Sequence, residues 1–198
     1  MEKEKVYHVN EIFYSLQGEG RWAGRAAIFV RFSGCNLKCP FCDTDSASYE
    51  KMTMKDILRE LMEYSECSFV VLTGGEPTLQ VTKEFVEVLH KNGYYVAMET
   101  NGTRAVPDNV DWVTVSPKVA YVDNGQLSMM VCDEVKVVYD GEHTPDTFGI
   151  TAKNYYVQPC DVGSATRNAE IIAACVRWVK QHPMWRLSLQ QQKILRVR

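Results

Sequence analysis

Short apolar segments alternate with amphipathic ones along most of the chain. The apolar segments are rich in β-branched and aromatic residues, which predicts strands at 27–32, 69–72, 95–98, 112–115, 135–138 and 155–157. A last strand is expected at 186–189, after Pro183. The segment 69–72 is apolar throughout, as in strands that are buried on both faces.

Three further segments have the spacing of helices. Thr53 is a candidate N-cap for a helix that extends to about residue 64. Residues 82–92 form a second candidate, which Gly93 suits as the C-terminal turn. The clearest helical pattern lies between Ser164 and Gln181, where apolar residues recur at helical spacing: Ala169, Ile172, Ala173, Val176 and Val179.

This alternation of strands and helices predicts an α/β fold with a parallel sheet and helices outside it. A complete eight-stranded barrel typically needs about 250 residues, and this chain has 198. The stretch 119–132 is too polar and glycine-containing for a full helix, so a crossover helix is missing there. We therefore predict an incomplete, open (β/α) barrel of the TIM-like type, with predominantly parallel strands, as a single domain over residues 1–198.

Composition narrows the class of protein without naming a function. Hydrophobic residues make up 45% and charged residues 24%, as in ordinary globular proteins, and the net charge of −3 gives no support for nucleic-acid or anionic-membrane binding. No apolar run could span a bilayer, and the polar N-terminus is no signal peptide. The odd cysteine count then predicts a reducing cytoplasm, with four scattered cysteines as small core residues: Cys67, Cys132, Cys160 and Cys175.

The other three cysteines form a C-x3-C-x2-C run: Cys35, Cys39 and Cys42. A structural zinc site needs four protein ligands and disulfides need an even number of thiols. A [4Fe–4S] cluster bound by three thiolates instead leaves one iron open to a substrate or cofactor. Half of a zinc site, completed by a histidine or a distant cysteine, remains an alternative, although no second cysteine pair or His-x3-5-His pattern supports it.

Unusual residues follow the ends of five predicted strands: the cysteine loop, then 73–77, 99–102, 116–118 and 158–159. In parallel (β/α) sheets ligands bind at that edge, because the loops converge there. Taken alone, Gly74-Gly75 and Asn101-Gly102 could be simple turns. Phosphate binding by the two glycines is not supported, since no Gly-x4-Gly-Lys pattern is present.

The cysteine run followed by Gly74-Gly75-Glu76 resembles the radical S-adenosylmethionine (SAM) enzymes. The segments 10–20, 29–37 and 42–44 are similar to one branch of them, the 7-carboxy-7-deazaguanine synthases of queuosine and 7-deazapurine biosynthesis, and the resemblance runs nearly end to end. It implies a radical SAM barrel that rearranges 6-carboxy-5,6,7,8-tetrahydropterin to 7-carboxy-7-deazaguanine with loss of ammonia. The 5′-deoxyadenosyl radical formed from SAM takes a hydrogen from pterin C6 and later returns it.

The resemblance also implies partners and site residues. Mg²⁺, a homodimer and a low-potential electron donor such as flavodoxin or ferredoxin are expected. Cys35, Cys39 and Cys42 would bind the [4Fe–4S] cluster, and Thr44 would bind Mg²⁺. SAM would be held by Phe41, Asp43, Gly75, Glu76, Ser116, Pro117, Lys118 and Gln158, and the pterin by Leu16, Gln17, Gly18, Arg31, Thr73, Gln192 and Arg198.

Some of these residues have plainer explanations, and two depart from the family pattern. Thr44 could instead make a turn or capping hydrogen bond, and Arg31 could be an outward strand residue. Gln192 stands where family members commonly have histidine, and glutamine binds but does not titrate near neutrality. Arg196 stands where glycine is expected.

Two other classes of function stay open at this level. A glycyl-radical activase would share the cysteine run but act on a protein, and the segment 16–20 and Thr44 argue against it. A non-enzymatic zinc or iron–sulfur module would bind metal without cleaving SAM.

Overall fold

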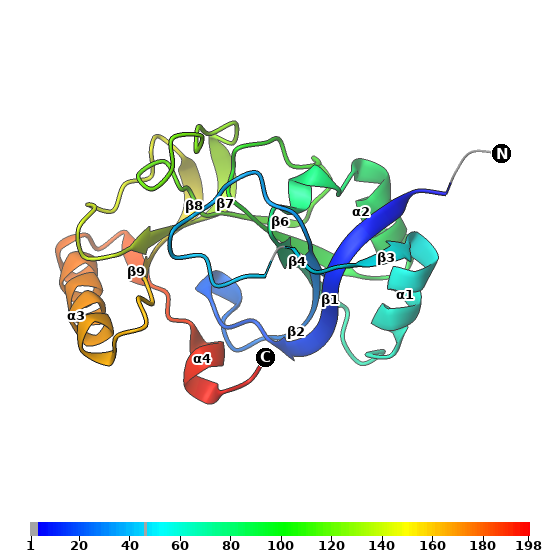
Figure 1. Ribbon diagram of the computed structural model, residues 1–198, viewed down its shortest axis with the longest axis horizontal. Coiled ribbons are helices and arrows are strands. Elements are labelled where there is room, and N and C mark those ends of the chain that lie inside the picture. The colour runs from blue at the N-terminus through cyan, green and yellow to red at the C-terminus, as the bar shows by residue number, and fades with distance from the viewer. Residues whose placement is uncertain (1–3, 46) are drawn as a thin grey trace.

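The described residues form one nine-stranded sheet that is strongly curved, like an incomplete barrel, with helices mainly on its outside (Figure 1). This computed structural model describes residues 4–45 and 47–198. The strand order is β3-β1-β2-β4-β5-β6-β7-β8-β9. The strands are β1 (Val6–Leu16), β2 (Ala26–Phe32), β3 (Glu50–Thr53), β4 (Phe69–Gly74), β5 (Tyr95–Thr100), β6 (Trp112–Val115), β7 (Val131–Tyr139), β8 (Thr151–Pro159) and β9 (Trp185–Leu187).

From β2 to β9 every neighbouring pair of strands is parallel. The α-helices are α1 (Met54–Met62), α2 (Lys83–Lys91), α3 (Ala165–Gln181) and α4 (Gln191–Leu195), and the 3-10 turns are η1 (Gly20–Trp22) and η2 (Pro77–Leu79). No helix lies between β6 and β7, which confirms the interpretation of residues 119–132. The prediction of an open, predominantly parallel (β/α) sheet is therefore confirmed.

Local chemistry explains where the helices begin. Thr53 and Asp56 form a reciprocal capping box: the Thr53 hydroxyl accepts from Asp56 N at 3.3 Å, and the Asp56 carboxylate accepts from Thr53 N at 2.9 Å. Thr82 caps α2 and Ser164 caps α3 with the hydroxyl alone, each accepting from the backbone N–H three residues on. The three residues at which the sequence predicted these helices to begin are thus their N-caps.

The N-terminal strand β1 was not predicted. It pairs antiparallel with β2 and with β3, and its register shifts between Val9 and Glu11. Such a bulge breaks the strict alternation of buried and exposed positions by which a half-buried strand is recognised. Polar residues at 10 and 11 therefore interrupt a strand that is continuous in the structure.

The buried face of α3 and the end of the last strand also differ from what the sequence pattern predicts. Helix α3 packs on the sheet through Ile171 and Cys175, which are buried, while Ile172 and Val176 are each 40% exposed. The apolar spacing thus located the helix, but its buried face lies one residue away. The last strand ends at Leu187 and not at residue 189, because Ser188 turns inward and its hydroxyl donates to Gln158 Oε1 at 2.8 Å.

The four scattered cysteines are buried and form no disulfide, as predicted. Within residues 4–45 and 47–198, no helix has the length and apolar character needed to cross a bilayer.

Arg196, which ends α4, has a left-handed backbone (φ 55°, ψ 38°). An L-residue with a side chain is strained there by about 1–2 kcal/mol, whereas glycine is not. We expect Arg196→Gly to raise the free energy of unfolding by about 0.5–1 kcal/mol in urea titrations, since glycine's greater freedom in the unfolded chain offsets part of the relief.

Gly93 supplies the matched control. It is also left-handed (φ 83°), and nothing lies within 4 Å of the position a Cβ would take. Gly93→Ala should therefore lower the free energy of unfolding by about 1 kcal/mol through backbone strain alone. An Arg196→Gly protein no more stable than wild type would show that contacts of the Arg196 side chain outweigh the strain.

Candidate active site

A cavity of about 540 Å³ opens at the carboxyl edge of the parallel strands. The loop between β2 and β3, which carries the three cysteines, crosses the opening of the curved sheet (Figure 1). All the site residues predicted from the sequence line this cavity except Glu76 and Pro117: Cys35, Cys39, Cys42, Phe41, Asp43, Thr44, Leu16, Gln17, Gly18, Arg31, Thr73, Gly75, Ser116, Lys118, Gln158, Gln192 and Arg198.

The cysteine loop presents three thiols to this cavity. Leu37 N donates to Cys35 Sγ at 3.4 Å, and Cys42 N donates to Cys39 O at 3.2 Å. Burial raises the pKa of the Cys35 and Cys39 thiols, so ligation is what would ionise them. Among the residues described, no three Cys, His, Asp or Glu side chains are grouped as a single metal ion would require. Three thiols with no fourth ligand suit a [4Fe–4S] cluster with one open iron better than tetrahedral zinc.

Gly75 packs directly on the cysteine loop. A Cβ at this position would overlap the carbonyl oxygen of Gly34 and lie 3.1 Å from Cys35 Cβ. Backbone hydrogen bonds join the same loops, from Gly75 N to Phe32 O at 3.0 Å and from Glu76 N to Gly34 O at 2.9 Å. The close approach that glycine permits in this structure is therefore to the cysteine loop. The predicted approach of Gly75 to SAM stays a prediction.

Glu76 lies outside the cavity lining and is fully buried. Its carboxylate accepts four hydrogen bonds: from Thr78 N at 3.1 Å, Thr78 Oγ1 at 2.6 Å, Thr100 Oγ1 at 2.8 Å and Asn101 N at 2.8 Å. These bonds tie the loop after β4 to the loop after β5. Glu76 thus has a clear structural role, and its predicted contact with SAM would require some of these bonds to be exchanged. Pro117 is also buried away from the cavity.

The other residues predicted to hold SAM line the cavity. Lys118 Nζ donates to Ser116 O at 2.7 Å and to Ser116 Oγ at 2.6 Å. Burial lowers the pKa of Lys118 to about 8, and the Cys39 thiolate would oppose that shift. Phe41 packs edge-on against Tyr121, with ring centroids 4.7 Å apart. Asp43 pairs with Lys193 at 2.9 Å, which links the cysteine loop to α4.

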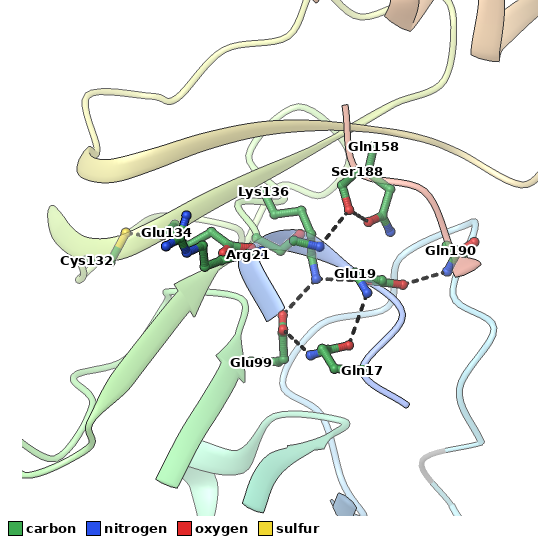
Figure 2. Close-up of polar contacts among 12 residues, drawn as sticks. Gln17, Glu19, Arg21, Glu99, Cys132, Glu134, Lys136, Gln158, Ser188 and Gln190 are labelled. Atoms are coloured by element: carbon green, nitrogen blue, oxygen red, sulfur yellow. Dashed lines mark hydrogen bonds and ion pairs between the residues drawn. The ribbon is translucent and has the colours of Figure 1, made fainter. Parts of the chain in front are cut away.

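A buried ionic network, which the sequence did not reveal, forms another wall (Figure 2). Lys136 of β7 is 5% exposed, and its Nζ lies 2.6 Å from Glu19 Oε2 and 2.9 Å from Glu99 Oε2. Burial alone would lower the pKa of Lys136, but the two carboxylates raise it. Burial likewise would raise the pKa of Glu19, but Lys136 lowers it to about 2. Gln17 joins the network by donating from Nε2 to Glu99 Oε1 at 3.2 Å.

Gln190 and Gln192 close this network from the C-terminal side. Both donate from Nε2 to Glu19 Oε1, at 3.0 and 3.2 Å respectively. Gln192 lies so close to Gly18 that a Cβ there would overlap its side-chain oxygen. That oxygen is buried and has no hydrogen-bond partner among residues 4–45 and 47–198. A ligand in the cavity could hydrogen-bond to it only after the side chain shifts to expose it.

Glu134 supports the loop that carries Glu19. Its side chain is fully buried, and its Oε2 accepts a hydrogen bond from Arg21 N at 2.9 Å. Gly20 is left-handed (φ 63°), and a Cβ there would overlap the Glu134 carboxylate. Burial, and then the nearby Glu99 carboxylate, raise the pKa of Glu134 to about 7.

The residues missed by the sequence analysis gave only weak signals. Glu19 and Glu99 lie inside segments that had been noted, 16–20 and 99–102, but as parts of motifs and not as charges. Lys136 stands in the apolar strand segment 135–138, where a charged residue indicates either an exposed face or a buried partner. Nothing in the sequence pairs it with carboxylates more than 30 residues away.

Comparison with known proteins agrees with this geometry. Residues 29–118 match the Radical SAM superfamily. The 7-carboxy-7-deazaguanine synthase of Bacteroides thetaiotaomicron is 45% identical to the chain over 190 residues, with 96% of this chain and 98% of that protein covered. The chain belongs to the 7-carboxy-7-deazaguanine synthase family. The synthase of Nitratidesulfovibrio vulgaris is 40% identical over 217 residues, with 96% and 98% covered.

The synthase family resemblance also holds for the fold. The crystal structure of QueE from Escherichia coli matches with a TM-score of 0.73 and 26% identity, covering 93% of this chain and 94% of that chain. The predicted resemblance to the radical SAM branch is thus confirmed. It is favoured over the glycyl-radical activase and the non-enzymatic metal module.

The raised pKa of Glu134 predicts a pH-dependent stability. The unfolded chain loses this proton near pH 4.5 and the folded chain near pH 7. The stabilising contribution of Glu134 to the free energy of unfolding is therefore fully present below pH 4.5 and is lost as the pH rises to 7. Glu134→Gln mimics the protonated side chain. From pH 5 to pH 8, its free energy of unfolding should improve relative to wild type by about 2–3 kcal/mol in denaturant titrations.

Glu87→Gln, an exposed change on α2, serves as the control and should give the same difference from wild type at both pH values. A Glu134→Gln difference that does not change with pH would contradict the shifted pKa.

Proposed function

We propose that this protein is a 7-carboxy-7-deazaguanine synthase. It converts 6-carboxy-5,6,7,8-tetrahydropterin to 7-carboxy-7-deazaguanine and releases ammonia, in the biosynthesis of 7-deazapurines such as the queuosine precursors. The observation that carries the proposal is the convergence of the cysteine loop and the pterin-side residues on one cavity, in a chain that belongs to this family over nearly its whole length.

The cofactor side of the cavity fits a cluster and SAM. Cys35, Cys39 and Cys42 would hold a [4Fe–4S] cluster. When bound, the cluster and SAM supply the one-electron chemistry that activates a C–H bond of the substrate. Lys118, a half-buried amine that donates to Ser116, suits the carboxylate of SAM, and Phe41, whose ring packs against Tyr121, lines the same cavity. Gln158 and Asp43 complete this side.

The opposite side of the cavity fits the pterin. The Gln192 side chain would hydrogen-bond the heterocycle after a shift that exposes its unpaired oxygen, and the backbone of Gly18 lies beside it. Gln17, Leu16 and Thr73 complete the lining. The Lys136 network keeps Glu19 ionised and fixed, so this wall is polar before any substrate arrives. No titrating side chain is needed at residue 192 for such binding.

Thr44 is proposed as a ligand of Mg²⁺, together with the substrate carboxylate. Thr44 lines the cavity, as its neighbour Asp43 does, and Mg²⁺ prefers oxygen ligands such as hydroxyl and carboxylate groups. The turn-capping explanation predicts instead that Thr44 has no effect on metal dependence.

The wider assignment follows from the family. A low-potential electron donor such as flavodoxin or ferredoxin would reduce the cluster. The protein would act in the cytoplasm as a homodimer of single radical SAM domains, without nucleic acid or membrane partners. The free thiols Cys67, Cys132, Cys160 and Cys175 support a reducing compartment.

An anaerobic assay of the reconstituted protein tests the reaction, with the tetrahydropterin, SAM, Mg²⁺ and a reductant. Product should form in wild type, and any one of Cys35→Ala, Cys39→Ala and Cys42→Ala should abolish it together with iron and sulfide content, because fewer than three thiolates cannot hold the cluster. Cys67→Ala, in the core, is the control and should retain iron. Deoxyadenosine formation without conversion of the pterin would reject the substrate, and iron bound without SAM cleavage would favour the metal-binding module.

Thr44→Val should reduce the stimulation by Mg²⁺ at least about tenfold, because the change removes the oxygen ligand and keeps the shape. Iron content and uncoupled SAM cleavage should stay at wild-type levels, since neither needs that ligand. The measurement is a Mg²⁺ titration of product formation, and an unchanged titration would return Thr44 to a turn-capping role.

A further inference from the structure

One lysine of α4 joins three segments at the cavity wall. Lys193 Nζ lies 2.9 Å from Asp43 Oδ2 in the cysteine loop and 3.1 Å from Asp161 Oδ2 in the loop between β8 and α3. All three residues line the cavity. Asp43 stands between Cys42, a proposed cluster ligand, and Thr44, the proposed ligand of Mg²⁺. Lys193 thus contacts the loop that carries the cofactor side of the site.

The Asp161 end of this bridge is held by its own loop. Asp161 Oδ1 accepts hydrogen bonds from Gly163 N at 3.0 Å and from Asn168 Nδ2 at 2.7 Å. Asn168 Oδ1 in turn accepts from Val162 N at 2.9 Å. These hydrogen bonds, and then Lys193, lower the pKa of Asp161 to about 2, so this carboxylate is ionised at neutral pH. Lys193 is therefore anchored to a fixed negative charge.

The Asp43 end has no comparable support. Among residues 4–45 and 47–198, Lys193 is the one partner of the Asp43 carboxylate. Two carboxylates share one ammonium here, so Lys193 stays paired with Asp161 when Asp43 moves away. The other carboxylates that line the cavity have partners of their own: Glu11 pairs with arginines, Glu19 and Glu99 with Lys136, and Asp45 with backbone N–H groups.

Helix α4 depends on polar contacts for its position. It has five residues, none of them buried, and Ile194 is 67% exposed. So short a helix is not stable by itself. Its other contacts lie on the wall proposed to bind the pterin, where Gln191 N donates to Gly18 O at 3.1 Å. Gln192 Nε2 donates to Glu19 Oε1 at 3.2 Å. The position of α4 is therefore set from both sides of the cavity.

We propose that Lys193 is a positioning residue, which couples the binding of SAM at the cysteine loop to the binding of the pterin beside α4. This rests on the proposed function and deepens it. A ligand that holds the cysteine loop fixes Asp43, and Asp43 then holds Lys193 and with it α4. The pterin meets a helix that is already ordered, so less conformational entropy is lost when it binds. Such coupling is reciprocal, so the pterin tightens the binding of SAM by the same factor.

The test compares the dissociation constant of SAM with and without saturating 6-carboxypterin, a non-reacting pterin, in the cluster-loaded protein. The measurement is isothermal titration calorimetry under anaerobic conditions without a reductant, so that SAM stays intact. In wild type the pterin should tighten SAM binding at least about fivefold. Lys193→Gln should reduce this coupling factor about three- to fivefold, the range that a partly exposed ion pair allows.

Two further variants separate the ion pair from the bulk of the lysine side chain. Asp43→Asn should lower the coupling factor as much as Lys193→Gln does. The double variant should lose no more than either single variant, because all three remove the same ion pair. Lys193→Arg keeps the charge and can still face both carboxylates, so it should retain the coupling. Equal loss in Lys193→Arg would assign the effect to packing and overturn the inference.

Hydrogen exchange gives a second readout, which needs no pterin. In wild type, SAM should slow the exchange of the backbone N–H groups of residues 191–195 about threefold or more, because ordering of α4 follows from Asp43 through Lys193. Lys193→Gln should abolish this protection. The response of residues 83–91 in α2 to SAM should be the same in both proteins.

Lys153→Gln is the matched control, because it also removes a lysine paired with an aspartate, Asp133 at 2.8 Å, but lies outside the cavity lining. Its coupling factor should equal that of wild type. Wild-type coupling in Lys193→Gln, additive losses in the double variant, or SAM that leaves the exchange of α4 unchanged in wild type would each overturn the inference alone. A wild type that binds SAM but no pterin overturns the proposed function and the inference with it.

Discussion

The pairing of the Lys136 ammonium with Glu19 and Glu99 is the interaction on which one wall of the cavity depends, the wall that we propose binds the pterin. It joins β7, β5 and the loop after β1, three segments that are distant in sequence. A buried charge left without its partner costs about 3–5 kcal/mol, so none of the three side chains can leave without disturbing the others. Glu134 also stabilises the loop that carries Glu19, by accepting a hydrogen bond from its backbone. Two glutamines near the C-terminus donate hydrogen bonds to Glu19 itself. The wall is thereby polar, charged and rigid before a ligand enters.

The parallel part of the fold could be predicted because its local signals agree with one another. Thr53, Thr82 and Ser164 cap the three helices that their positions suggested, and the apolar segments became strands β2 and β4 to β9. Strand β1 could not be predicted, since the bulge at Val9–Glu11 removes the period-two pattern. The face of α3 was not apparent either, because apolar residues occupy both sides of that helix. Both failures concern which side a residue faces, and only tertiary packing settles that.

In the candidate site, too, local features could be predicted from the sequence and contacts between distant segments could not. Short motifs such as the cysteine run carry their chemistry within a few residues and could be recognised from the sequence. Lys136 is paired with carboxylates on β5 and in the loop after β1, far away in the sequence, so no local pattern marks it. Glu76 and Gly75 were recognised for chemistry with SAM, yet in the structure they join loops to each other. A residue in a motif can therefore serve the architecture of a site as well as its ligand.

The hydrogen bonds to Glu19 have a consequence for how the protein is made. Gln190 and Gln192 follow Glu19 by 171 and 173 residues, whereas Gly75 meets the cysteine loop within a much shorter stretch of chain. At about 5–20 residues per second, a ribosome needs on the order of ten seconds or more to add the later partners. Contacts so distant in sequence also form late in folding. During that interval the residues of the cysteine loop and the glycine loop have already been synthesised, whereas the two glutamines that complete the hydrogen bonds to Glu19 have not.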